Sequence, residues 1–103
     1  MSRAVIWSRP AARDLMEAFR FIAQDNPDAA TRVTSAIRLV GTRLGVQGTG
    51  RPGRVTGTYE KSVPGRPYVI AYALRGRDDG QIVEILRAIH TTRNWPEGGW
   101  PKA

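Results

Sequence analysis

The segment from Gln81 to Pro96 holds the residues with the clearest potential for chemistry. It begins as an apolar run typical of a strand, and then places Arg87, His90, Arg93 and Trp95 within nine residues. An arginine in the middle of a strand is unusual in so small a protein, and a guanidinium group binds phosphate or carboxylate through a planar fork. We therefore predict a surface for an anionic ligand at this strand end: phosphate, nucleic acid or an acidic peptide.

These residues also have plain structural interpretations. Arg87 could form an ion pair with Glu60 or Glu84, and His90 could be a hydrogen-bonded histidine at the end of a strand. Trp95, with the proline that follows it, could cover an apolar edge. Metal chemistry lacks ligands, because the chain has no cysteine, one histidine and no clustered carboxylates. We expect neither a metal site nor a cofactor.

Charge and composition limit the classes of partner that the chain is expected to bind. The chain has 103 residues and a formal net charge of +7, with 16 basic against 9 acidic residues. Such an excess favours anionic partners and speeds association with them. No apolar run approaches the roughly 18 residues of a membrane span, and no secretory signal is visible at the N-terminus. We expect one domain, covering residues 1–103, in the cytoplasm and without membrane contact.

The elements that position these residues can be read from start signals and periodicity. Residues 3–7 form a short apolar strand candidate, followed by two helices at about 9–25 and 27–44. Ser8 and Asn26 are capping residues, each followed closely by proline. The short break between the helices predicts an antiparallel hairpin. Its predicted core contacts are Leu15, Phe19, Ile22, Val33, Ile37 and Val40.

The second half of the chain reads as a glycine-rich loop followed by strands. Residues 45–57 contain five glycines with Arg51 and Arg54, and we predict no regular structure there; the two arginines are either a binding surface or solvated loop charges. Three strands follow at 58–63, 67–74 and 81–89, joined by short turns. Tyr68, Ile70 and Tyr72 fall on one face of the middle strand. This predicts an α+β fold.

The order of these elements, the segment GRPGRVTGTYE, the strand PYVIAYAL and the ending VEILRAIHTTRNWP resemble the RelE/ParE superfamily, the toxic halves of type II toxin–antitoxin modules. The resemblance extends from Val5 to Pro96, and the residues of these segments are most similar to those of the ParE branch. It implies a βααβββ fold with the helical hairpin packed on an antiparallel sheet.

The two branches imply different chemistry. RelE-type members are ribosome-dependent mRNA interferases, which need arginines and a proton-transfer group; the matching set here is Glu60, Arg87, His90 and Arg93. ParE-type members poison DNA gyrase by binding, with no catalytic step. Where RelE-type toxins commonly have a tail tyrosine this chain has Trp95, whose indole has no titratable proton.

We therefore predict a gyrase inhibitor that is not an enzyme, with the mRNA interferase as the alternative. A third interpretation is a non-toxic module that sequesters an antitoxin. Tyr59 stands where ParE-like sequences often have arginine, so any role of that arginine is lost. The resemblance also implies a hetero-oligomer with a ParD-like antitoxin, whose helix would fill a hydrophobic groove between hairpin and sheet. The predicted partner-binding residues are Leu15, Phe19, Arg51, Arg54, Arg87, His90, Arg93 and Trp95.

Overall fold

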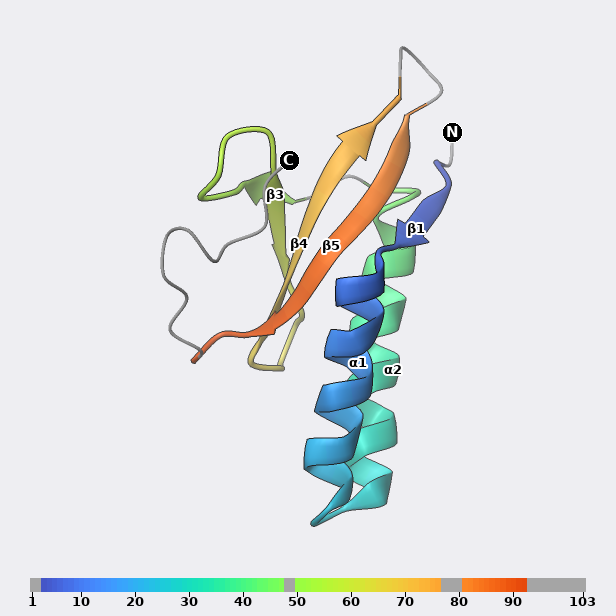
Figure 1. Ribbon diagram of the computed structural model, residues 1–103, viewed down its shortest axis with the longest axis vertical. Helices are drawn as coiled ribbons and strands as arrows, with labels where there is room; N and C mark the ends of the chain where they lie inside the picture. Colours follow the sequence, from blue (N-terminus) through green and yellow to red (C-terminus); the bar gives the residue numbers. More distant parts are fainter. Residues whose placement is uncertain (1–2, 48–49, 77–80, 93–103) are drawn as a thin grey trace.

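The computed structural model describes residues 3–47, 50–76 and 81–92, and places two helices on one face of a five-stranded sheet built from them (Figure 1). The elements are β1 Val5–Trp7, α1 Arg9–Ala23, α2 Pro27–Arg43, β2 Arg51–Pro52, β3 Tyr59–Ser62, β4 Tyr68–Arg75 and β5 Ile82–His90. The strand order is β1-β5-β4-β3-β2. The predicted α+β class and the helical hairpin on a sheet are confirmed.

Two strands depart from the sequence-based expectation. β1 pairs with β5 in parallel, with Val5 opposite Val83, so the sheet is antiparallel except at this edge. β2 lies inside the glycine-rich segment that was predicted to be irregular, and that prediction was wrong for Arg51 and Pro52. These two residues pair with β3 at the other edge of the sheet. Proline is tolerated at such an edge because the side of the strand where its N–H is missing faces solvent.

The helix starts match the capping signals. The Ser8 hydroxyl accepts a hydrogen bond from the Ala11 N–H at 3.2 Å and donates one to the Leu86 carbonyl at 3.0 Å. The Asn26 side chain accepts from the Ala29 N–H at 3.0 Å. Ser8 therefore caps α1 and at the same time fastens the start of α1 to β5.

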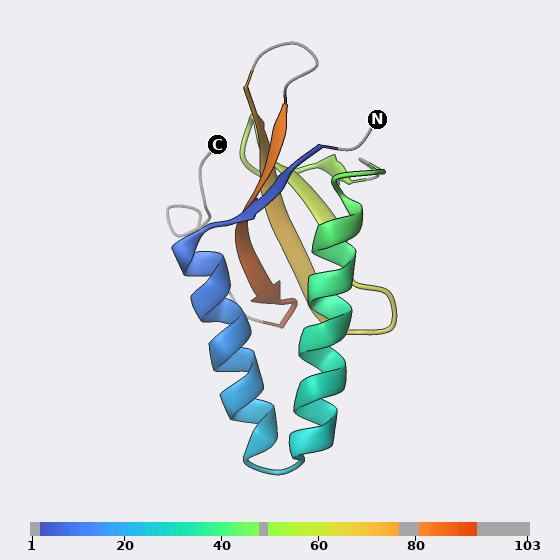
Figure 2. The same cartoon turned by 90° about the vertical axis from the view of Figure 1, so that its right-hand side faces the viewer.

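The main core lies between the hairpin and the sheet. The two helices run side by side, and their tip extends beyond the end of the sheet (Figure 2). Ile37 and Leu44 of α2 are buried, as are Ile70 and Tyr72 of β4. The predicted face of β4 is thus confirmed. The buried members of this cluster are Ala11, Leu15, Val33, Ile37, Leu44, Val63, Tyr68, Ile70, Tyr72, Val83, Ile85 and Ala88.

Phe19 is an exception, because its side chain is 40% exposed where the sequence predicted a core position. The residues of α1 that contact the core are Ala11, Leu15, Ala18 and Ile22. Their spacing of four, three and four residues is a regular helical stripe, and Phe19 lies one position past it. Phe19 therefore lies at the rim of the core.

The opposite face of the sheet carries a smaller apolar cluster. Val69 and Ala71 of β4 and Ile89 of β5 are buried there, with Val55 packed against them. Cross-strand partners share a face of a sheet, so the residues paired with this row also belong to the outer face. Glu60 is one of them, because it pairs with Ala71.

Candidate functional site

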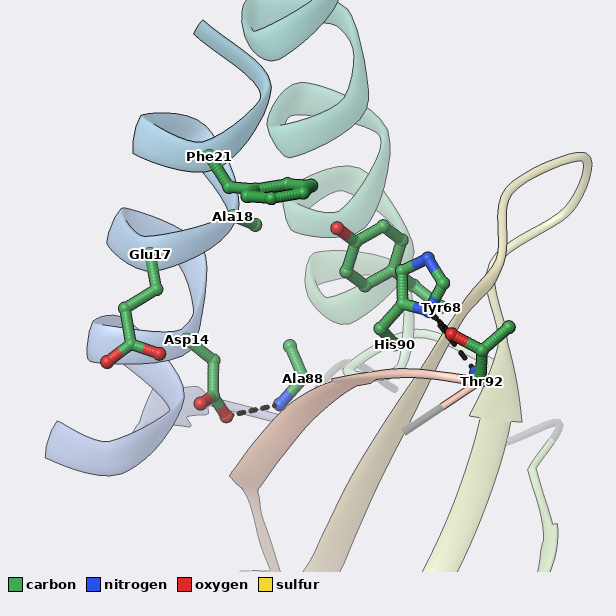
Figure 3. Close-up of a pocket in the computed structure, with 8 residues that line it drawn as sticks. All are labelled: Asp14, Glu17, Ala18, Phe21, Tyr68, Ala88, His90 and Thr92. Carbon is green, nitrogen blue, oxygen red and sulfur yellow. Dashed lines mark hydrogen bonds between the residues drawn. The ribbon is translucent and has the colours of Figure 1, made fainter. Parts of the chain in front are cut away.

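A groove of about 580 Å³ lies between α1 and the end of the sheet. α1 contributes one wall, and β4, β5 and Thr92 in the turn after β5 contribute the other (Figure 3). The groove is mostly apolar, with a carboxylate-rich wall on the helix and a histidine on the strand. Its lining residues are Asp14, Glu17, Ala18, Phe21, Tyr68, Ala88, His90 and Thr92.

The groove stays open because the hairpin extends beyond the end of the sheet (Figure 2). The sheet ends at His90, while α1 continues past it towards the hairpin tip (Figure 1). Phe21 consequently has no strand to cover it and is 74% exposed, although its ring points towards Tyr68 (Figure 3). An aromatic ring left this open beside an apolar groove is typical of a site for a partner.

Asp14 forms the inner end of the groove and binds Arg87. The two guanidinium nitrogens Nε and Nη2 donate to the carboxylate oxygens at 2.8 and 2.9 Å, which is the bidentate geometry of a strong ion pair. The hydrogen bond with Asp14 raises the pKa of Arg87, so its charge is fixed. The suggested partners Glu60 and Glu84 were wrong for this arginine.

The fold explains why Asp14 is the partner. β1 ends at Trp7, so the edge of β5 beyond Ile85 has no neighbouring strand. A β-bulge at this point leaves Leu86 without a partner in β4, because Ala71 pairs with Arg87 and Tyr72 with Ile85. The Asp14 carboxylate takes the place of a strand by accepting the Ala88 N–H at 3.0 Å.

His90 lies on the strand wall of the groove with its ring edge against Tyr68. Its Nδ1 accepts the backbone N–H of Thr92 at 3.2 Å and lies 2.6 Å from the Thr92 hydroxyl. A backbone N–H can only donate, so Nδ1 carries no proton and the neutral ring holds its proton on Nε2. In this tautomer Nε2 is a hydrogen-bond donor, and the basic lone pair on Nδ1 already accepts the Thr92 N–H.

Glu60 is buried on the far face of the sheet and holds the two loop arginines. Its carboxylate lies 3.5 Å from Arg51 and 3.2 Å from Arg54, and it also accepts the Arg54 backbone N–H at 2.9 Å. The side chains of Arg51 and Arg54 remain 59% and 53% exposed. This arrangement orders a basic loop around one carboxylate and leaves the guanidinium edges towards solvent.

The two proton-transfer groups proposed from the sequence, Glu60 and His90, therefore lie on opposite faces. Glu60 pairs with Ala71, which is on the outer face, whereas His90 pairs with Tyr68, which is on the hairpin face. Arg87 lies in the same cross-strand row as Glu60 but directs its guanidinium to Asp14 on α1. These three side chains do not converge on a common point.

The remaining predicted site residues are scattered or undescribed. Leu15 and Phe19 line a separate hollow of about 380 Å³ between α1 and α2, on the other side of α1 from the groove. Arg93 and Trp95 lie outside the described residues. Of the predicted residues that the structure describes, only His90 lines the groove itself, with Arg87 beside it through Asp14.

Three residues of the groove, Asp14, Glu17 and Phe21, were not predicted from the sequence. One signal was available, because the stretch Phe19–Ile22 (FRFI) has three large apolar residues among four, more than one face of a helix can bury. No comparable signal marked Asp14, since its partner is 73 residues away in sequence.

Other classes of site are not evident in the described part of the chain. Within residues 3–47, 50–76 and 81–92 no group of three or more histidine or carboxylate side chains is placed to hold a metal ion. Nor is any helix among them long and apolar enough to cross a membrane.

Comparison with known proteins gives concordant matches over most of the chain. Residues 5–95 match the family model described as the ParE toxin of the type II toxin–antitoxin system parDE. A protein of Sinorhizobium fredii (strain NBRC 101917 / NGR234), named "Putative toxin Y4kP", is 39% identical over 99 residues, covering 94% of this chain and 98% of that protein.

Two solved structures share the fold at low identity. One belongs to the chromosomal ParDE toxin–antitoxin system from P. aeruginosa, with a TM-score of 0.74 and 24% identity over 86% of this chain and 96% of that one. The other is in the toxin–antitoxin complex RelBE2 from Mycobacterium tuberculosis, with a TM-score of 0.65 and 23% identity over 87% of this chain and 99% of that one. Such identities establish the common fold alone.

Proposed function

This chain belongs to the ParE toxin family of type II toxin–antitoxin systems, and we propose on that basis that it inhibits DNA gyrase by binding and is neutralised by a ParD-like antitoxin. The family match extends over residues 5–95. The proposal takes the target from the ParE branch and the mode of action, binding without catalysis, from the geometry of this chain.

The observation that supports binding without catalysis is that the sheet separates Glu60 from His90. Cleavage of RNA requires a base and an acid that act on one phosphodiester, with cations around the same phosphate. Glu60 is on the outer face, His90 is in the groove, and Arg87 is bound to Asp14. Glu60 and His90, the two described residues that the sequence suggested for proton transfer, thus lie on different surfaces.

The groove beside α1 is the proposed seat of the antitoxin. An amphipathic helix laid into it would cover Phe21, Ala18 and Tyr68, which is the helix-in-groove mode of recognition. A toxin–antitoxin interface of this kind should bury more than about 1,000 Å² in total. The basic surface of the chain would speed its encounter with an acidic antitoxin.

Substitution of the exposed ring tests this seat. Phe21→Ala should weaken binding of the antitoxin encoded beside this chain by at least about tenfold, because an aromatic anchor in a groove contributes about 2 kcal/mol or more. Leu39→Ala is the matched control, since Leu39 is 52% exposed on α2 and lines none of the described hollows. Equal affinity of the two variants, measured by titration calorimetry, would place the antitoxin elsewhere.

The target is tested by two purified reactions run side by side. In one, the chain is added to gyrase with supercoiled DNA, and trapped cleavage complexes are measured. In the other, it is added to ribosomes translating an mRNA, and cleavage of the message is measured. DNA cleavage without mRNA cleavage supports the proposal, the reverse supports an mRNA interferase, and antitoxin binding with neither activity supports a sequestering module.

A further inference from the structure

We infer that the antitoxin segment in the groove beside α1 presents a lysine or arginine to Glu17. This inference rests on the proposed function in one respect, since it takes the occupant of the groove to be the antitoxin. It adds the chemistry of the contact: a basic residue at one defined point, flanked by apolar residues, within a partner that is expected to be acidic overall.

The two carboxylates of the groove differ in what they already bind. Asp14 is 8% exposed, and its oxygens are taken by the Arg87 fork and the Ala88 N–H. Glu17, one helical turn further on, is exposed, and its side chain forms no hydrogen bond or ion pair with any described residue. The hydrogen bond with Asp14 is the main cause of the raised pKa of Arg87, and the charge of Glu17 contributes to it. The guanidinium itself already binds Asp14.

The groove consequently has an excess negative charge in a chain of net charge +7. Asp14 is paired with Arg87, which leaves Glu17 as the carboxylate of the helix wall that forms no ion pair with a described residue. A neutral occupant would bring apolar surface against that carboxylate and partly desolvate it, which costs free energy unless a cation or donor accompanies it. A lysine or arginine in the occupant removes this penalty.

The neighbours of Glu17 favour the same choice. Phe21 lies four residues later on α1, so the carboxylate and the ring are adjacent on one face of the helix. The long apolar stem of lysine or arginine can pack on Phe21 and Ala18 while the cationic head reaches Glu17. A cation close to the ring face is also attracted by the aromatic quadrupole.

Charge reversal at Glu17 separates this local contact from the overall field of the protein. Glu17→Lys and Asp25→Lys change the net charge equally, and Asp25 lies between α1 and α2 without lining any of the described hollows. An overall electrostatic attraction to an acidic antitoxin predicts that both variants bind as tightly as the wild type or more tightly. A basic contact at Glu17 predicts the opposite result for Glu17→Lys alone.

The probe is the full-length antitoxin encoded beside this chain, titrated against wild type and variants at two salt concentrations. We expect Glu17→Gln to weaken binding by about two- to fivefold, as for an exposed ion pair, and Glu17→Lys by at least about tenfold, because attraction becomes repulsion. Asp25→Lys should bind with unchanged or higher affinity. Replacing one basic residue of the antitoxin by glutamate should restore binding to Glu17→Lys.

Three results would overturn the inference or its premise, and they can be told apart. If Glu17→Lys binds as well as Asp25→Lys, no basic residue faces Glu17, although the antitoxin still binds. If Phe21→Ala and Glu17→Lys are both without effect, the antitoxin lies elsewhere on the chain. If the wild type itself does not bind, the proposed function fails. Thermal melts of each variant establish that loss of binding is not loss of fold.

Discussion

At the scale of single residues, Arg87 shows what a sequence can and cannot reveal. A guanidinium inside an apolar strand predicted a bound carboxylate or anion, and the structure supplies a carboxylate. Its identity could not be predicted, because Asp14 lies on the first helix and meets Arg87 only when a β-bulge and the end of β1 expose the edge of β5. The arginine is committed to an internal ion pair that fastens α1 to the sheet.

Loss of this pair should destabilise the fold. We expect Asp14→Ala to lower the free energy of unfolding by about 3 kcal/mol, because it removes both hydrogen bonds to the partly buried Arg87 guanidinium and leaves the Ala88 N–H without an acceptor. Urea denaturation measures the change. Glu17→Ala, which removes an exposed carboxylate from the same helix, should stay within about 0.5 kcal/mol of the wild type; equal losses would refute the assigned role of Asp14.

Tyr72 gives the stability of the protein a dependence on alkaline pH. Its side chain is 2% exposed and accepts the Gly50 N–H at 3.1 Å. Burial raises the pKa of Tyr72 above its ordinary value of 10.0, although the hydrogen bond from Gly50 and the charge of Arg3 act in the other direction. Because the pKa is raised in the folded state, the neutral Tyr72 side chain contributes its full stabilisation below about pH 10. This stabilisation is lost as the pH rises through the folded pKa.

The test compares urea midpoints of the wild type and Tyr72→Phe between about pH 8 and 11. The variant should be less stable at pH 8 by about 1 kcal/mol, because the Gly50 N–H loses its acceptor. The difference should narrow as the pH rises, since the phenyl ring of the variant has no proton to lose. Tyr59→Phe, which alters the stacked neighbour but keeps Tyr72, should retain the alkaline decline; a constant difference would disprove the role of ionisation.

At the scale of elements, the parts fixed by local signals were predicted and those fixed by distant contacts were not. Ser8 and Asn26 cap the helices within their own turns, so both helix starts could be predicted closely. The two-residue strand β2 and the parallel pairing of β1 depend on partners elsewhere in the chain. The helical period of α1 was also correct, but its buried stripe is centred on alanines rather than on Phe19.

This difference between Phe19 and Ile37 is measurable. Ile37 is fully buried, so Ile37→Ala should cost about 2–5 kcal/mol of unfolding free energy. Phe19 keeps 40% of its surface in water, and Phe19→Ala should cost about 1 kcal/mol, well below the 3–5 kcal/mol of a buried phenylalanine. Chemical denaturation of the two variants checks the ranking, and a reversed order would return Phe19 to the core.

At the scale of the whole molecule, the sheet divides the predicted site residues between two faces. The outer face carries the basic loop held by Glu60, with Arg51 and Arg54 largely exposed. The hairpin face carries the groove with its acidic wall. From the sequence Arg51, Arg54, Arg87, His90 and Arg93 were proposed as partner-binding residues. Composition gives no information about which side of a sheet a residue occupies, so the separation of Arg51 and Arg54 from His90 could not be predicted.

His90 is the residue that tests this division functionally. Its ring holds the proton on Nε2 and accepts the Thr92 backbone N–H at Nδ1, so its basic nitrogen is already engaged. His90→Ala should therefore leave inhibition of gyrase within about threefold of the wild type in a supercoiling assay, whereas loss of a catalytic acid or base costs about 10²–10⁴ in rate. Codon-phased mRNA cleavage by the wild type, abolished in this variant, would identify an interferase instead.

The parallel contact of β1 with β5 also has a consequence for how the chain acquires its structure. Ser8 and Leu86 are joined by a hydrogen bond across 78 residues, and β5 is the strand that contacts β1, β4 and α1. Contacts between such distant segments slow folding, because a long loop must close before they form. During synthesis the helical hairpin emerges early, but β5, which pairs with β1 and β4 and contacts α1, follows only from residue 82 onwards. The sheet that the structure describes therefore cannot be completed until β5 has left the ribosome.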